Sequence, residues 1–240
     1  CRLGRRGDAL AAYDLLRHAL RDELGIDPGP TATEMHARIL ADDGRCPTSA
    51  PRGPRRGAPP RPRTPTIGRD RELAALSEQL AAGRRLVTIV GPGGVGKSHL
   101  LAEFATGVPA RTALAYAELP CVPDAAPAAV AETIAHAAGI TLGAGGDPVD
   151  RLAAALRPSE ALWLLDEAEW ALAASTAVIG RLLSACPRIR FVVTSRVRLD
   201  LRGESLLLLG PLPAPPTGAS AAGLRAFPAM RLFVDRLGDH

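Results

Sequence analysis

Eight residues in the first half of the chain read Gly91-Pro92-Gly93-Gly94-Val95-Gly96-Lys97-Ser98. They match the pattern G-x-x-x-x-G-K-[ST], and they stand between an apolar run and a segment with helical periodicity, which is the context that this motif requires. Glycines let the backbone curl so that successive N–H groups point at a phosphate, and the following helix adds positive charge at its N-terminus. The stretch therefore predicts a P-loop, in which Lys97 contacts the β and γ phosphates of a nucleotide and the Ser98 hydroxyl ligates Mg²⁺. A plain Gly-rich turn between a strand and a helix is the alternative.

Short apolar runs alternate with helical patterns around this loop. The expected strands are Arg85 to Val90, Leu114 to Glu118, Ala161 to Leu165, Phe191 to Thr194 and Leu206 to Leu209. These runs are apolar nearly throughout, as in parallel strands that helices cover on both faces. The expected helices are Ser98 to Thr106, Ala128 to Ala138, Asp147 to Leu156 and Ala168 to Cys186. Residues 67–215 are therefore predicted to form an α/β domain of the P-loop NTPase class, a parallel sheet with flanking helices.

Acidic residues end the apolar run Leu162-Trp163-Leu164-Leu165-Asp166-Glu167. A P-loop needs a second Mg²⁺ anchor at the end of a neighbouring strand, and Asp166 is expected to hold the metal through water. Glu167 is placed to polarise an attacking water, which would make the domain capable of hydrolysis. The alternative for Glu167 is a carboxylate that only complements the dipole of the helix that follows.

One arginine follows the next expected strand, in the sequence Thr194-Ser195-Arg196. It lies at the edge of the sheet where ligands of open α/β folds bind, so Arg196 is a candidate for sensing the γ-phosphate. Lys97 is the single lysine of the chain, and nearly all of the positive charge is arginine. An ordinary surface arginine is therefore the alternative. Lys97, Glu167 and Arg196 are the candidate catalytic residues.

Two segments precede this domain. Residues 1–44 carry apolar residues at three- and four-residue steps up to Leu24, then a capping-box spacing at Thr31 and Glu34, and they predict a helical hairpin. Residues 45–66 interleave prolines with arginines and predict an extended linker. Contact of these arginines with DNA phosphates is the alternative to a solvated basic linker.

Composition excludes several classes of protein. Lys plus Arg number 29 and Asp plus Glu number 25, so the formal charge of +4 is weak evidence for nucleic acid binding. The four cysteines lie far apart, which indicates neither a zinc site nor a disulfide framework, and a reducing cytoplasm is expected. No apolar stretch reaches roughly 18 residues and the N-terminus lacks the apolar core of a signal peptide, so we expect no membrane partner and no export. The first residue is Cys1 and not Met, and the chain is expected to be part of a longer protein.

Other P-loop classes lack support in this sequence. A Ras-type GTPase reads guanine through an N-K-x-D element, which needs a second lysine. The L-S-G-G-Q signature of ABC transporter ATPases is absent from the sequence. Small-molecule kinases usually carry their P-loop at the extreme N-terminus, whereas 90 residues precede Gly91 here. The expected ligand is therefore ATP or ADP with Mg²⁺.

Together these residues resemble the large bacterial regulators of the antibiotic-regulatory-protein type, which join a transcriptional activation domain to a STAND-class ATPase related to NB-ARC. The segments Gly4 to Tyr13 and Glu23 to Pro30 are similar to the closing repeat of the activation domain, a TPR-like helical module. The segments Leu209 to Pro213 and Ala229 to Val234 look like the exit from the ATPase core and the start of a helical lid at residues 216–240. The resemblance covers nearly the whole chain.

The resemblance adds site residues. Ile67-Gly68-Arg69-Asp70-Arg71-Glu72-Leu73 is similar to the element that opens STAND and AAA-like ATPases, which implies that Gly68 and Arg69 contact nucleotide; a simple helix start is the alternative. The likeness of Thr194-Ser195-Arg196 to the sensor segment of the family favours the role given to Arg196. Two residues depart from the family pattern: Glu167 stands where relatives usually have Asn, which implies faster hydrolysis, and His99 follows Ser98 in the nucleotide-binding set.

The resemblance implies a nucleotide-controlled switch in a transcriptional regulator. DNA would be bound only through domains that this chain lacks, RNA polymerase is a candidate partner, and a nucleotide-dependent oligomer is a further expectation. Two alternatives stay open: an ATPase whose turnover is itself the function, and a scaffold that docks partners through its helical hairpin and retains a vestigial nucleotide site.

Overall fold

The computed structural model of the chain describes residues 59, 61–62, 64–122, 124–214 and 227–238. The predicted helical hairpin, most of the predicted linker and part of the predicted lid lie outside the described residues. The predicted domain boundaries stay predictions.

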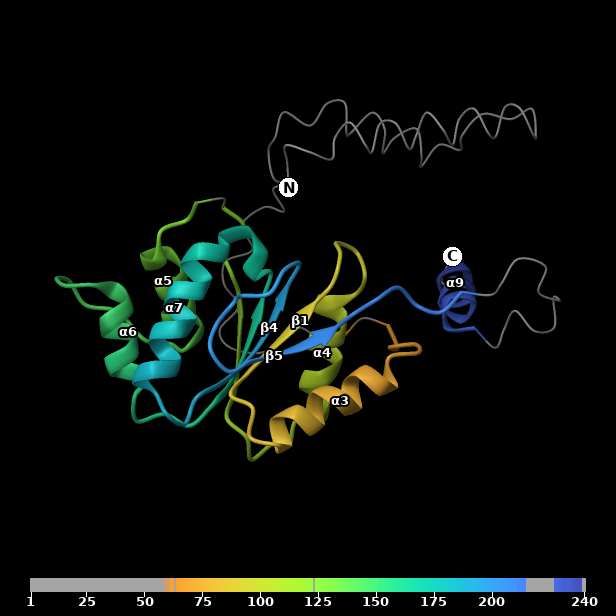
Figure 1. Ribbon diagram of the computed structural model, residues 1–240, viewed down its shortest axis with the longest axis horizontal. Coiled ribbons are helices and arrows are strands. Elements are labelled where there is room, and N and C mark those ends of the chain that lie inside the picture. Colours follow the sequence, from red (N-terminus) through yellow and green to blue (C-terminus); the bar gives the residue numbers. More distant parts are fainter. Residues whose placement is uncertain (1–58, 60, 63, 123, 215–226, 239–240) are drawn as a thin grey trace, which may run out of the picture. The chain divides into compact units, whose positions relative to one another are not determined.

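A five-stranded parallel sheet forms the centre of the described domain (Figure 1). Its order is β2-β3-β4-β1-β5, and the strands are β1 (Leu86–Val90), β2 (Leu114–Glu118), β3 (Leu162–Asp166), β4 (Arg190–Ser195) and β5 (Glu204–Leu208). Every pair of neighbouring strands is parallel. The predicted fold class is confirmed, and each predicted strand overlaps an observed one.

Helices follow most of the strands. They are α3 (Asp70–Ala81), α4 (Lys97–Gly107), α5 (Pro127–Ala137), α6 (Pro148–Leu156), α7 (Leu172–Ala185) and α9 (Pro228–Gly238), with a 3₁₀ turn η1 (Ala168–Ala171) ahead of α7. Helix α6 begins where prediction placed it, because the Asp147 carboxylate accepts a hydrogen bond from the Val149 N–H and caps the helix. No helix within the described ranges has the length and apolar content needed to cross a membrane.

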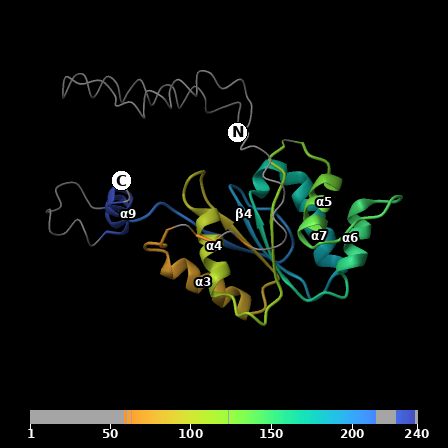
Figure 2. The same cartoon turned by 180° about the vertical axis from the view of Figure 1, so that it is seen from behind.

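Each face of the sheet carries its own hydrophobic core, because successive side chains of a strand point to opposite faces. On β1, Leu86 joins the core that also contains residues of α5, α6 and α7, whereas Val87 and Ile89 join the core under α3 and α4. Figures 1 and 2 show these two groups of helices on opposite sides of the sheet. Two buried faces explain why the strands are apolar almost throughout.

One helix was predicted with the wrong start. The segment from Ala168 to Cys186 was expected to be continuous, but it starts as the turn η1, and the α-helix begins only at Leu172. The break lies at Ala171, whose φ of −124° and ψ of 49° leave the helical region. This turn holds two residues of the site that periodicity alone did not single out, Glu169 and Trp170.

The sheet brings the predicted site residues to one edge. Leu165 of β3 is opposite Val193 of β4, so Asp166 and Thr194, the next residues, emerge together at the carboxyl ends of the strands. The P-loop follows β1, which pairs with β4. Ligands of open α/β sheets bind at this edge.

Candidate nucleotide-binding site

The P-loop connects β1 to α4. Gly94 and Gly96 adopt φ values of +79° and +99°, a region that side chains rarely allow, and Gly96 is the N-cap of α4. At Gly91 a Cβ would lie 2.4 Å from the Leu209 carbonyl oxygen, so the loop can pass this close to the end of β5 only without a side chain. Gly94 and Gly96 therefore allow the curl that the sequence predicts, and Gly91 allows a close approach to the end of β5.

Lys97 is folded back across this loop. Its side chain is 8% exposed, and its Nζ donates hydrogen bonds to the carbonyls of Gly91 at 3.0 Å and Pro92 at 3.2 Å. The same Nζ lies 3.8 Å from Oε1 of Glu169. A buried ammonium group at the mouth of a helix N-terminus is the donor set that a phosphate oxygen requires.

Asp166 and Ser98 meet as the sequence predicts. The Ser98 hydroxyl donates to Oδ1 of Asp166 at 3.0 Å, although 68 positions separate them. The same carboxylate accepts hydrogen bonds from the hydroxyls of Thr194 and, at 3.4 Å, Tyr116. Burial raises the pKa of Asp166, and the three hydroxyl donors oppose that rise. A hydroxyl and a carboxylate held together offer the hard oxygen ligands that Mg²⁺ prefers.

Glu167 begins the turn η1 in a strained backbone conformation. Its φ of 63° and ψ of 37° are left-handed, which is uncommon for a residue other than glycine. Its N–H donates to the Thr194 hydroxyl at 2.9 Å, so Thr194 fixes both Asp166 and Glu167. Burial raises the pKa of Glu167, and the charge of Asp166 adds to the rise. Its side chain makes no capping hydrogen bond to η1, and its role in hydrolysis stays a prediction.

Arg196 lies against the P-loop. Its Nε donates to Oε1 of Glu169 at 3.2 Å, and its guanidinium carbon lies 5.1 Å from the centre of the Trp170 ring. A Cβ on Gly93 would lie 3.3 Å from Nη2 of the arginine. The guanidinium is thus placed beside the phosphate-binding loop.

These groups surround one cavity of about 220 Å³. Its lining consists of P-loop residues and of the ends of β3 and β4: Gly93, Gly94, Gly96, Lys97, Ser98, His99, Glu167, Glu169, Thr194 and Arg196. The structure therefore brings together most of the site residues that the sequence predicts, from three separate segments of the chain.

The predicted pair Gly68 and Arg69 does not line this cavity. Arg69 is 8% exposed, and its Nη2 donates to the carbonyls of Gly210 at 2.7 Å and Val95 at 3.2 Å, while Nη1 pairs with Glu72 at 2.7 Å. The arginine thus ties the P-loop to the chain that leaves β5. Direct contact of Arg69 with nucleotide stays a prediction.

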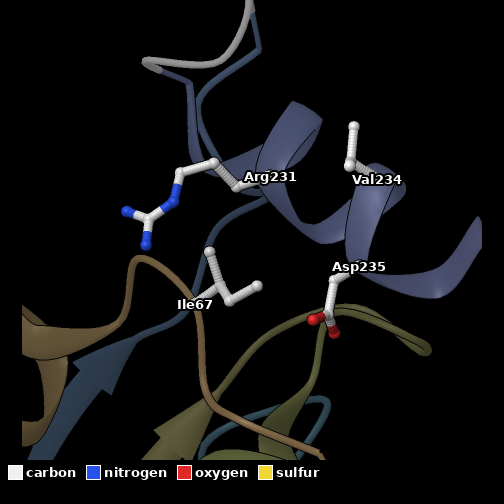
Figure 3. Close-up of a pocket in the computed structure, with 4 residues that line it drawn as sticks. All are labelled: Ile67, Arg231, Val234 and Asp235. Atoms are coloured by element: carbon white, nitrogen blue, oxygen red, sulfur yellow. The ribbon is translucent and has the colours of Figure 1, made fainter. Parts of the chain in front are cut away.

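A second, larger cavity of about 440 Å³ lies beside Gly68. It is lined by Ile67 and by Arg231, Val234 and Asp235 of α9 (Figure 3). Gly68 has a φ of +70°, and a Cβ there would lie 2.4 Å from the Cβ of Pro228. None of these four lining residues belongs to the P-loop, whereas the smaller cavity is lined by P-loop residues.

Other polar contacts escaped the sequence analysis. His99, expected among the nucleotide-binding residues, has Nε2 2.9 Å from the Thr66 hydroxyl, which donates to Glu103 at 2.8 Å. His99 lines the smaller cavity, of about 220 Å³, and its contact with nucleotide stays a prediction. The position of Tyr116 in the strand beside β3 was a usable signal for its contact with Asp166, but only once the strand order was known.

Residues 65–194, more than half of the chain, match the family described as AAA ATPase domain. The chain belongs to this family. Residues 1–40 of this AAA ATPase chain match a second family, described as bacterial transcriptional activator domain.

Several curated relatives of this AAA ATPase chain are named as regulators. A Mycobacterium tuberculosis protein named as an HTH-type transcriptional regulator is 35% identical over 125 residues, which cover 52% of this chain and 14% of that protein. Regulatory protein AfsR of Streptomyces griseus is 32% identical over 225 residues, 86% of this chain and 23% of AfsR. Transcriptional regulator RedD of Streptomyces coelicolor is 55% identical over 42 residues, 18% of this chain and 12% of RedD. The chain thus spans less than a quarter of the length of these three proteins, and the predicted resemblance to regulators of the antibiotic-regulatory-protein type is confirmed.

Solved structures with a similar backbone include Cdc6p from Pyrobaculum aerophilum, with 18% identity, a TM-score of 0.48, and coverage of 64% of this chain and 47% of that one. A STAND protein with a tetratricopeptide repeat sensor from Pyrococcus horikoshii has 16% identity and a TM-score of 0.43, and the match covers 65% of this chain and 24% of that one.

Proposed function

We propose that the described domain is the nucleotide switch of a transcriptional regulator, which binds ATP or ADP with Mg²⁺ at the P-loop. The observation that carries the proposal is the hydrogen bond between Ser98 and Asp166 at the mouth of a glycine-rich loop that also holds Lys97. In this proposal the loop amides and Lys97 hold the phosphates, Ser98 and Asp166 hold the metal, and Arg196 faces the terminal phosphate. DNA contacts belong, in the same proposal, to other parts of such regulators, as the HTH-type name of a relative suggests. RNA polymerase is a proposed partner.

A switch also needs a path from the site to the rest of the protein. Arg69 supports one, because its guanidinium bonds to the P-loop carbonyl of Val95 and to the carbonyl of Gly210, which leads from β5 towards α9. A change in the backbone of the P-loop would alter one of these two bonds. Nucleotides shift such an equilibrium only if they bind its two states with different affinity.

Calorimetry of the 240-residue chain with MgATP and MgADP tests binding. We expect heat with both nucleotides in the wild type and none in Lys97→Ala, with Arg71→Ala, an exposed arginine on α3, as the control. The absence of heat in the wild type would refute nucleotide binding. Hydrogen exchange of Pro228–Gly238 then tests the switch: identical protection with ATP and ADP would refute it even if both bind.

An ATPase whose turnover is the function is the second candidate, and the placement of Glu167 beside the P-loop favours it. A general base must lie near the water that it activates, and burial that raises the pKa of Glu167 makes its carboxylate a stronger proton acceptor. Steady turnover that is lost in Glu167→Gln, while nucleotide binding is retained, would support the enzyme. Turnover that is unchanged in this variant would count against it.

A further inference from the structure

Glu169 places a negative charge where the site should attract phosphate. Its carboxylate is 11% exposed, and a single oxygen, Oε1, lies 3.2 Å from Nε of Arg196 and 3.8 Å from Nζ of Lys97. Its other oxygen, Oε2, is buried and has no hydrogen-bond partner among the described residues. The carboxylate thus binds two cations at once and lines the same cavity as the P-loop.

Those two cations are the ones that the proposed function assigns to phosphate. Lysine of a P-loop reaches the β and γ phosphates, and Arg196 is the candidate partner of the γ-phosphate. A carboxylate and a phosphate oxygen cannot share these cations without like-charge repulsion, which is strong where water is scarce. A nucleotide must therefore compete with Glu169 for them.

The competition differs between the two nucleotides. A diphosphate that is held by the loop amides and Lys97 leaves the Arg196–Glu169 pair in place. A triphosphate needs both cations, and so it must break both contacts of Glu169. We infer that Glu169 is a specificity-determining residue that weakens ATP binding relative to ADP binding, an inference that rests on the proposed function.

The structure also supplies a reporter. Trp170 follows Glu169 in the turn η1 and stacks with the Arg196 guanidinium. The other tryptophan of the chain, Trp163, is 2% exposed within the core on β3. Separation of Arg196 from Glu169 would change the surroundings of Trp170 and leave those of Trp163 constant.

Binding constants test the inference. We expect Glu169→Gln to tighten MgATP binding by about two- to fivefold more than MgADP binding, within the range that exposed ion pairs contribute. The control is Glu160→Gln, the same chemical change at an exposed residue that precedes β3, at the end of this strand away from Asp166. It should leave both binding constants unchanged. In the wild type, MgATP should change tryptophan emission more than MgADP does, and Trp170→Phe should remove this difference.

Each outcome separates this inference from the proposed function. If the wild type binds both nucleotides and Glu169→Gln keeps the wild-type ratio of their affinities, the inference fails and the proposed function stands. If the wild type binds neither, both fail. If Glu169→Gln does not fold, Glu169→Asp is the second variant, since it keeps the charge on a side chain that is shorter by one methylene. We expect a smaller shift of the affinity ratio towards ATP in this variant. An unchanged ratio overturns the inference.

Discussion

The same substitution, threonine to valine, should destabilise the protein on one of two neighbouring strands and not on the other. Thr194 on β4 and Thr88 on β1 are both fully buried. The Thr194 hydroxyl donates to the Asp166 carboxylate and accepts from the Glu167 N–H. The Thr88 hydroxyl has no hydrogen-bond partner among the described residues. Valine has nearly the same shape as threonine, so the substitution isolates the hydroxyl.

The magnitude follows from these contacts. Thr194→Val removes a hydrogen bond to a charged group, worth about 1.5–3 kcal/mol, and leaves the N–H of Glu167 without its partner. We expect the free energy of unfolding to fall by about 3 kcal/mol, because neighbouring losses do not add fully. Thr88→Val removes only a buried hydroxyl without a partner, and the free energy of unfolding should be unchanged or rise by about 1 kcal/mol.

Urea unfolding followed by tryptophan fluorescence measures both changes in the free energy of unfolding. In thermal unfolding, the melting temperature of Thr194→Val should be about 6–12 °C lower than that of the wild type, for a domain of this size. Thr194→Ser is the companion variant, since it keeps the hydroxyl and deletes the methyl group. The reasoning is refuted if Thr194→Val is as stable as the wild type, or if Thr194→Ser is the less stable of the two.

Three further predictions concern other contacts. Arg69→Ala should lower the free energy of unfolding by about 2 kcal/mol, because its two carbonyl partners lose a buried donor. Arg71→Ala, on the exposed side of α3, should leave the free energy of unfolding unchanged, and urea unfolding compares the two variants. Gly91→Ala should lower the free energy of unfolding by about 2 kcal/mol, since the added Cβ would overlap the carbonyl oxygen of Leu209. Gly107 has open space around it, so Gly107→Ala should leave the melting temperature nearly unchanged. Burial raises the pKa of the Cys186 thiol, so less thiolate forms at about pH 8, and mass spectrometry should find Cys186 unmodified by iodoacetamide in the native protein and modified after denaturation.

The P-loop and its meeting with Asp166 were predictable because both follow from short-range patterns. Glycines at fixed spacing determine the loop, and apolar strands that all run parallel bring their carboxyl ends to one edge. The contacts of Arg69 were not predictable in this way, since its carbonyl partners lie 26 and 141 positions along the chain. Glu169 was missed for a local reason: helical periodicity continues through this segment, and only the break at Ala171 turns it into a separate 3₁₀ turn.

The charges at the sheet edge also bear on how a nucleotide would enter. Among the described residues, three carboxylates, Asp166, Glu167 and Glu169, meet two cations, Lys97 and Arg196. Burial raises the pKa of Glu167, and its acidic neighbours add to the rise while Arg196 lowers it, so the protein already holds these negative charges at a cost. The amides of the P-loop contribute only partial positive charges. On the proposed function, a polyphosphate without metal would add negative charge to a site that already has more carboxylates than cations. Mg²⁺ bound between Ser98 and Asp166 would reverse this excess of negative charge. The need for the metal therefore arises from the carboxylates of the protein as much as from the phosphates of the ligand.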